Sequence, residues 1–115
     1  MNANLFLNCR CSSREESIEK LVFALAETSE IFSVRSDELL GKTRGENPVC
    51  WARIAAMATL WDAGVTLKMI GAFFGGRDHA TVINAVRRLP DIITYCPQFA
   101  KNVQALRQSL GVPQI

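Results

Sequence analysis

The chain has 115 residues, of which 49% are hydrophobic and 21% charged, and its formal net charge is +2. This length suits one domain with a hydrophobic core, and the composition is that of a soluble globular protein. No stretch reaches the roughly 20 apolar residues that a membrane helix needs, and the N-terminus lacks the basic start and long apolar run of a signal peptide. We therefore expect a cytoplasmic protein with no membrane partner.

The charge is distributed unevenly along the chain. Residues 1–47 carry six basic and eight acidic side chains, whereas residues 48–115 carry seven basic and three acidic ones. The excess of positive charge in the second part suits a surface that binds phosphate groups.

The cysteines and the one histidine predict neither a metal site nor a catalytic site. Cys9 and Cys11 form a Cys-x-Cys near the N-terminus, whereas Cys50, Cys96 and His79 stand alone. Structural zinc sites usually show paired Cys-x-x-Cys or Cys/His groups. No nucleophile is spaced to join the histidine. We expect reduced thiols, no metal, no cofactor and no enzymatic activity. A disulfide or a metal site is the alternative for the cysteines.

The beginning of the chain predicts a tail and an amphipathic helix. We expect residues 1–12 to be a flexible tail and residues 13–115 to form one helical domain. Ser13 and Glu16 match a capping box, and a helix is expected from there to about Phe32. Helical spacing assigns its core face to Ile18, Leu21, Val22, Leu25 and Ile31 or Phe32. A helix that docks on a partner is the alternative interpretation.

A short helical turn and a polar loop are expected next. Ser36 is the predicted N-cap of the turn, and Gly41 is predicted to end it. Residues 42–47 carry two cations, Lys42 and Arg44. This loop is either simply solvated or contacts a DNA backbone or minor groove.

A helix rich in alanine follows the loop. Asn47 is its expected cap, and Pro48 suits the first helical position. The helix is expected to reach Ala63, because Gly64 follows it. Its small side chains let neighbouring helices approach closely, and its apolar bulk comes from Ile54, Met57, Leu60 and Trp61.

The stretch from residue 66 to residue 89 predicts a helix-turn-helix. Thr66 caps a short helix whose apolar side comprises Leu67, Ile70, Ala72 and Phe73 or Phe74. Gly75 and Gly76 suit the reversal of the chain, since glycine tolerates positive φ. Asp78 is the expected N-cap of the second helix, and we expect Pro90 to stop it.

The C-terminal part predicts one more helix. We expect residues 91–95 to be a connector, and Cys96-Pro97 to open a helix that reaches about Leu110. Its apolar face comprises Phe99, Val103, Leu106 and Leu110. Because the sequence shows no β alternation, the predicted fold class is all-α, a bundle of about six helices.

The second helix of the predicted motif has two different faces. The apolar face comprises Val82, Ala85, Val86 and Leu89. The opposite face comprises Ala80, Asn84, Arg87 and Arg88, with Thr81 on the flank. Such a helix packs on the core with one face only and therefore lies on the surface.

The start of this helix carries groups suited to reading base edges. They are Arg77, Asp78, His79 and Thr81. Arginine pairs with guanine, aspartate accepts from cytosine, and methyl groups of alanine or threonine meet the thymine methyl. In a helix-turn-helix the N-terminal part of the second helix enters the major groove. DNA recognition is therefore the leading hypothesis.

Several of these residues also have a purely structural interpretation. Asp78 is an N-cap whether or not it contacts a base, and His79 lies toward the buried flank of the wheel, where it would pack locally. Arg87 and Arg88 near the end of the helix complement the helix dipole. These alternatives stay open on the sequence alone.

The same stretch resembles a known family. Residues 74–82, FGGRDHATV, resemble the signature FGGRDHTTV of the C-terminal DNA-binding domain of the bacterial replication initiator DnaA at eight of nine positions. Three further segments resemble the family: TLKMIG at 66–71, ARIAAM at 52–57 and SDELLGK at 36–42. The similarity covers roughly residues 14–108.

The resemblance implies sequence-specific binding of double-stranded DNA at a site like the DnaA box, in control of replication initiation or transcription. It implies an all-α helix-turn-helix bundle of the DnaA and Trp repressor type. It assigns Arg77, Asp78, His79 and Thr81 to the major groove. For the minor-groove arginine it favours Arg53 slightly over Arg44, and it makes Lys68 a phosphate contact. The predicted DNA-binding set is completed by Ala80, Asn84, Arg87 and Arg88.

Three departures from the family pattern qualify the role. Ala80 replaces the first threonine of the signature, and the loop at 42–47 is less basic than is usual for the family. The sequence contains no G-x-x-x-x-G-K-[ST], so we expect a stand-alone relative that binds no nucleotide rather than a complete initiator. The alternative function is a protein-interaction module that kept the fold and binds an initiator or another replication protein.

Overall fold

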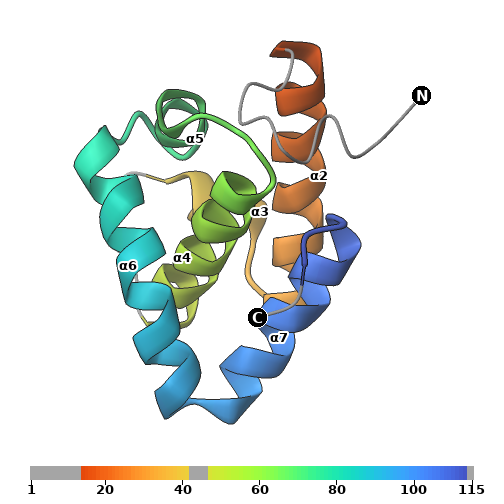
Figure 1. The fold of residues 1–115 in the computed structure, drawn as a ribbon, viewed down its shortest axis with the longest axis vertical. Coiled ribbons are helices and arrows are strands. Elements are labelled where there is room, and N and C mark those ends of the chain that lie inside the picture. Colours follow the sequence, from red (N-terminus) through yellow and green to blue (C-terminus); the bar gives the residue numbers. More distant parts are fainter. Residues whose placement is uncertain (1–13, 42–46, 114–115) are drawn as a thin grey trace.

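A computed structural model describes residues 14–41 and 47–113 of the chain. This part of the chain folds into six helices and contains no strand, so the all-α prediction is confirmed (Figure 1). The predicted tail at 1–12, the Ser13 cap and Arg44 lie outside the described residues. The helices are α2 (Arg14–Phe32), α3 (Ser36–Leu40), α4 (Asn47–Asp62), α5 (Leu67–Phe73), α6 (His79–Tyr95) and α7 (Pro97–Ser109).

The helix α4 forms the centre of the bundle. It runs between α6 on one side and α2 and α7 on the other, with α5 near one end (Figure 1). Every residue from Ala52 to Leu60 is buried, which explains why the helix carries so many alanines. Small side chains on a central helix allow its neighbours to pack closely from several directions. Trp51 and Trp61 both lie half-buried at the edge of this core.

The core face predicted for α2 is wrong in part. Ile18 and Val22 are 46% and 55% exposed, although helical spacing placed them inside. The predicted Leu21 is buried, and Leu25, Ile31 and Phe32 are partly buried, but the other buried residues of α2 are Ser17, Ala24 and Thr28. The side chains of Ser17, Ala24 and Thr28 are small, which lets α2 pack closely against α4 and α7. Ser17 and Thr28 are polar, so a search for apolar residues at helical spacing does not find this buried face.

The end predicted for the second motif helix is also wrong. The helix α6 continues through Pro90 to Tyr95, across the residues expected to form a connector. Proline removes one backbone donor and usually ends or kinks a helix. Here Leu89 and Ile92 are both buried on the two sides of Pro90, and the far end of α6 packs against α7. Tertiary packing therefore outweighs the local signal.

Smaller differences concern the helix ends. Ser36 is the first residue of α3 rather than its cap, because Arg35 occupies the N-cap position. The helix α4 begins at Asn47 and ends at Asp62, one residue before the expected Ala63. The apolar face predicted for α7 is confirmed, with Phe99, Val103 and Leu106 buried and Leu110 partly buried. In the described part of the chain, none of the helices combines the length and apolarity required to cross a bilayer.

Candidate nucleic-acid interface

The turn between α5 and α6 brings two backbones into close contact. Gly75 and Gly76 adopt φ values of 84° and 73°, the left-handed region that favours glycine. The Arg77 amide donates to the Gly71 carbonyl at 2.8 Å. A Cβ on Gly71 would lie 2.2 Å from the Arg77 carbonyl oxygen, so only glycine fits where α5 crosses the start of α6. This confirms the predicted helix-turn-helix and explains its glycines.

The start of α6 is fixed by its N-cap, Asp78. One carboxylate oxygen, Oδ1, accepts from the Thr81 amide at 3.1 Å and from the Thr81 hydroxyl at 3.2 Å. Capping of this kind satisfies donors that the first turn of a helix otherwise leaves unpaired. Both side chains remain exposed, so the cap does not remove them from contact with a ligand.

The outer face of α6 carries the four residues that the sequence assigned to it, and in addition Thr81 and His79. We use this name for the six exposed side chains His79, Ala80, Thr81, Asn84, Arg87 and Arg88. His79 is exposed, so the alternative of a packed histidine is wrong. The opposite face is held to the core by Val82, Ala85 and Leu89, which are buried, and by Val86, which is partly buried. The helix thus presents a polar row on a rigid support.

Arg77 lies differently from what the sequence suggested. Its guanidinium points toward α3 and donates to the Phe74 carbonyl through Nη1 and to the Gly41 carbonyl through Nη2 at 2.8 Å. The side chain is partly buried, and burial lowers the pKa of Arg77, an effect that the nearby Cys50 opposes. The structure therefore separates Arg77 from the exposed residues that follow it.

Arg53 is the most buried cation among the predicted site residues. It is only 5% exposed, and it donates from Nε to the Leu39 carbonyl at 2.9 Å and from Nη2 to the Glu38 carbonyl at 2.6 Å. Burial lowers its pKa, and the positive charge of Arg77 lowers it further, while Cys50 acts in the opposite direction. Arginine nevertheless stays charged at any physiological pH. Its described contacts join α4 to the end of α3.

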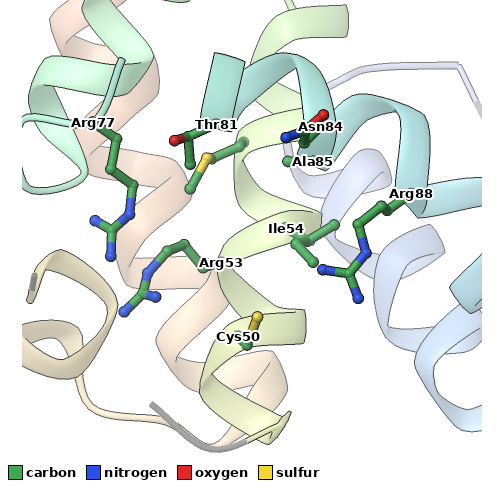
Figure 2. A pocket seen from close by; sticks show the side chains of 9 residues that line it. Cys50, Arg53, Ile54, Arg77, Thr81, Asn84, Ala85 and Arg88 are labelled. Carbon is green, nitrogen blue, oxygen red and sulfur yellow. The ribbon is translucent and has the colours of Figure 1, made fainter. Parts of the chain in front are cut away.

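Arg53 and Arg77 border a cleft between α4 and α6. The cleft has a volume of about 470 Å³, and its other polar lining residues are Cys50, Thr81, Asn84 and Arg88. Figure 2 shows the guanidinium groups of Arg53 and Arg77 next to one another, with Arg88 farther along the cleft. Among the residues that the structure describes, the lining includes three arginines and no carboxylate, so this side of α6 favours an anion.

Lys68 lies on the other side of the motif. It is exposed on α5 and borders a shallow hollow together with the start of α6, where Asp78 and His79 lie. A cation beside the N-terminus of a long helix suits a backbone phosphate. The predicted DNA-binding residues thus fall into an exposed group on α5 and α6 and an inward-facing pair, Arg53 and Arg77.

Sequence reasoning missed the contacts of this inward-facing pair. Three of their four carbonyl partners, those of Glu38, Leu39 and Gly41, lie 14 to 36 residues away, and such contacts leave no local pattern. One signal was present, since Arg53 interrupts a run of mostly small apolar residues on a helix that neighbouring helices were expected to approach closely. The described residues contain no cluster able to hold a metal ion, and Cys50 and Cys96 are free thiols.

Comparison with known proteins identifies the motif. The family described as bacterial DnaA protein helix-turn-helix matches residues 24–89, more than half of the chain. This match spans α4, α5, the glycine turn and the part of α6 that carries the exposed polar face.

Several curated proteins are similar over most of the chain. The chromosomal replication initiator protein DnaA of Ruegeria sp. (strain TM1040) is 32% identical over 101 residues, 88% of this chain and 21% of the relative. The DnaA of Chlorobaculum tepidum is 32% identical over 97 residues, 84% of this chain and 18% of the relative. That of Cutibacterium acnes is 38% identical over 65 residues, 56% of this chain and 13% of the relative. The chain therefore spans about a fifth or less of the length of these relatives.

Proposed function

The chain belongs to the bacterial DnaA helix-turn-helix family, and on this basis we propose that it binds double-stranded DNA sequence-specifically, at a site like the DnaA box. Family membership supports DNA binding connected with replication initiation. The proposal adds sequence specificity, a role in the control of replication initiation or of transcription, and a cytoplasmic location on the nucleoid.

The observation that carries this proposal is the exposed polar face of α6. The helix is anchored by the buried Val82, Ala85 and Leu89, while its first turns expose groups that donate and accept hydrogen bonds. A helix held in this way by a short preceding helix is the element that a helix-turn-helix inserts into the major groove. A rigid support also keeps the ordering cost of binding low.

We assign base contacts to the first turn of α6. The capping hydrogen bonds of Asp78 use its carboxylate oxygen Oδ1, and the other oxygen, Oδ2, suits a cytosine amino group. His79 and Thr81 extend the reading surface, and the methyl group of Ala80 suits a thymine methyl.

We assign phosphate contacts to the surrounding cations. Lys68 lies on α5 beside the start of α6, and Arg87 and Arg88 lie farther along the outer face. Phosphate contacts fix the position of the protein on the duplex but carry no sequence information. Lys68→Ala should therefore weaken binding to all sequences alike and reduce the salt slope by about one.

The test is a titration of labelled duplexes at several salt concentrations. One duplex carries a DnaA box and the control carries the same bases scrambled. We expect the affinity for the first to exceed that for the second by about 10³-fold or more. Equal affinities at every salt concentration would contradict sequence-specific binding.

A second candidate function has one specific observation in its favour. Three large apolar side chains are exposed on α2: Ile18, Val22 and Phe23, which are 46%, 55% and 45% exposed. Exposed apolar residues that lie together are typical of protein contacts. An interaction module would bind a replication protein with α2.

The second candidate is tested with a purified DnaA initiator. A complex that forms without DNA and is lost on Val22→Asp would favour it. Glu19→Asp, an exposed and conservative change on the same helix, is the matched control. Failure of the two proteins to associate at micromolar concentrations would reject it.

A further inference from the structure

We propose that Arg77 is a positioning residue, which sets the start of α6 by bridging the motif turn to α3, and that it does not read a base. This inference rests on the proposed function, because positioning matters for a helix that reads DNA. It assigns to Arg77 a task different from that of the exposed residues Asp78, His79 and Thr81.

The bridge consists of two hydrogen bonds from one guanidinium group. Nη1 donates to the carbonyl of Phe74, the fully buried residue that ends α5, and Nη2 donates to the carbonyl of Gly41, the residue that ends α3. Charged donors make stronger hydrogen bonds than neutral ones, and the two branches of an arginine fork have a fixed geometry. One side chain therefore satisfies carbonyls at two helix ends that are remote in sequence.

The space around the bridge shows how closely the turn approaches α3. A Cβ on Gly75 would lie 2.8 Å from the Leu40 carbonyl oxygen and 2.8 Å from Nη1 of Arg77. Both distances are shorter than ordinary van der Waals contacts of carbon. The turn, the guanidinium and the end of α3 thus form a packed junction rather than a loose surface loop.

Arg53 holds the other side of this junction. It lies on the central helix α4 and donates to the Glu38 and Leu39 carbonyls, just before the Gly41 carbonyl that Arg77 binds. The connection therefore runs from α4 through α3 to the turn of the motif. We call this set of Arg53, Arg77 and the carbonyls of residues 38, 39, 41 and 74 the arginine junction.

The arginine junction fixes the position of the first turn of α6, to which the proposed function assigns the base contacts. Arg77 directly precedes Asp78, the N-cap of α6, so a shift of the turn would move the whole first turn of the helix. In Figure 2 the Arg77 guanidinium points toward Arg53 at one end of the cleft, with Arg88 farther along it. To contact a base, the guanidinium would have to break its hydrogen bonds to the Phe74 and Gly41 carbonyls, and leaving these carbonyls unpaired costs free energy.

The experiment compares Arg77→Ala and Arg77→Lys with Lys101→Ala, an exposed lysine on α7 that serves as the charge control. Each variant is titrated with a DnaA-box duplex and with duplexes in which one base pair at a time is replaced. Amide hydrogen exchange of the DNA-free proteins is measured at Leu39 and Gly41 by NMR. All measurements are made below the unfolding temperature of each variant.

We expect Arg77→Ala to weaken binding to every duplex by about tenfold or more, with the ranking of the duplexes unchanged. Exchange at Leu39 and Gly41 should become faster in the free protein. Arg77→Lys keeps the positive charge but lacks the two-branched guanidinium group, so its effects should be intermediate. This variant replaces Arg77→Ala if the alanine variant does not fold. Lys101→Ala should match the wild type.

Two results would overturn the positioning role. One is a change in ranking at a single base pair, which is the mark of a base contact. The other is unchanged exchange at Leu39 and Gly41. The exchange measurement needs no DNA, so it tests the bridge independently of DNA binding. A wild type that shows no preference among duplexes would refute the proposed function but would leave the test of the bridge intact.

Discussion

The arginine junction and the outer face of α6 both carry arginine, yet they differ in what their polar groups contact. At the junction, the guanidinium groups of Arg53 and Arg77 donate to backbone carbonyls inside the protein. On the outer face, Arg87 and Arg88 are exposed and form no ion pair with another described residue.

The two regions therefore differ in their expected contributions. The arginine junction stabilises the fold, whereas the outer face of α6 is available to bind DNA. A group that satisfies buried carbonyls contributes to folding, because its removal leaves them unpaired. A group that faces water contributes little to folding and remains available to a ligand. Substitutions at the junction should therefore lower stability, whereas substitutions on the outer face should lower DNA affinity alone.

The largest effect is expected for Gly71→Ala. The added Cβ would meet the Arg77 carbonyl oxygen at 2.2 Å, so α5 and the start of α6 would have to move apart. We expect the free energy of unfolding to fall by about 3 kcal/mol, measured by urea denaturation. Ala72→Ser, an exposed change one residue later, should stay within about 0.5 kcal/mol of the wild type. Equal stabilities of the two variants would show that this crossing is not tight.

A loss of about 2–3 kcal/mol is expected for Arg53→Met, because both hydrogen bonds from the charged donor are lost at a buried site. The matched variant is Arg87→Met, which removes an exposed arginine on α6 and should change stability by no more than about 0.5 kcal/mol. Thermal and urea unfolding of both proteins give the comparison. A similar loss in both variants would remove the distinction between the two regions.

A smaller difference is expected between the two glycines of the turn. Gly75→Ala and Gly76→Ala each place a side chain at positive φ, at a cost of about 1–2 kcal/mol. Gly75→Ala should lose roughly another 1 kcal/mol, because its Cβ would also meet the Leu40 carbonyl oxygen and the Arg77 guanidinium. In the described part of the chain, apart from its two chain neighbours, no atom lies within 4 Å of a Cβ on Gly76. Identical unfolding curves for the two variants would argue against the close approach of the turn to α3.

The smallest change in stability is expected on the outer face. Arg87→Ala should leave the free energy of unfolding within about 0.5 kcal/mol of the wild type. The same variant should weaken binding to all duplexes and lower the salt slope by about one, because we propose that Arg87 contacts one phosphate. Fluorescence titrations between low and moderate salt measure the slope. A slope equal to that of the wild type would exclude Arg87 from the DNA interface.

Local signals predicted the motif well. Thr66 and Asp78 act as N-caps as expected, each accepting from an amide three residues on, and the glycines reverse the chain. These features depend on neighbours in sequence, so they are visible without a structure. The exposure of Asn84 and Arg87 followed equally from the helical period, because the opposite face of α6 is strongly apolar.

Tertiary contacts account for what the sequence did not predict. In α2 the buried line includes Ser17 and Thr28, which no hydrophobic pattern would select. In α6 the burial of Ile92 carries the helix past Pro90. The inward direction of Arg77 depends on a carbonyl 36 residues away, which no local rule anticipates.

NMR can show whether the outer face of α6 contacts DNA. Amide resonances of the labelled protein would be followed during titration with a DnaA-box duplex at a salt concentration where the scrambled duplex binds weakly. We expect the largest shifts in the first turns of α6, from His79 to Arg88, with little change around Ile18 and Val22 on α2. Shifts concentrated on α2, with α6 unaffected, would show that the outer face of α6 does not contact DNA.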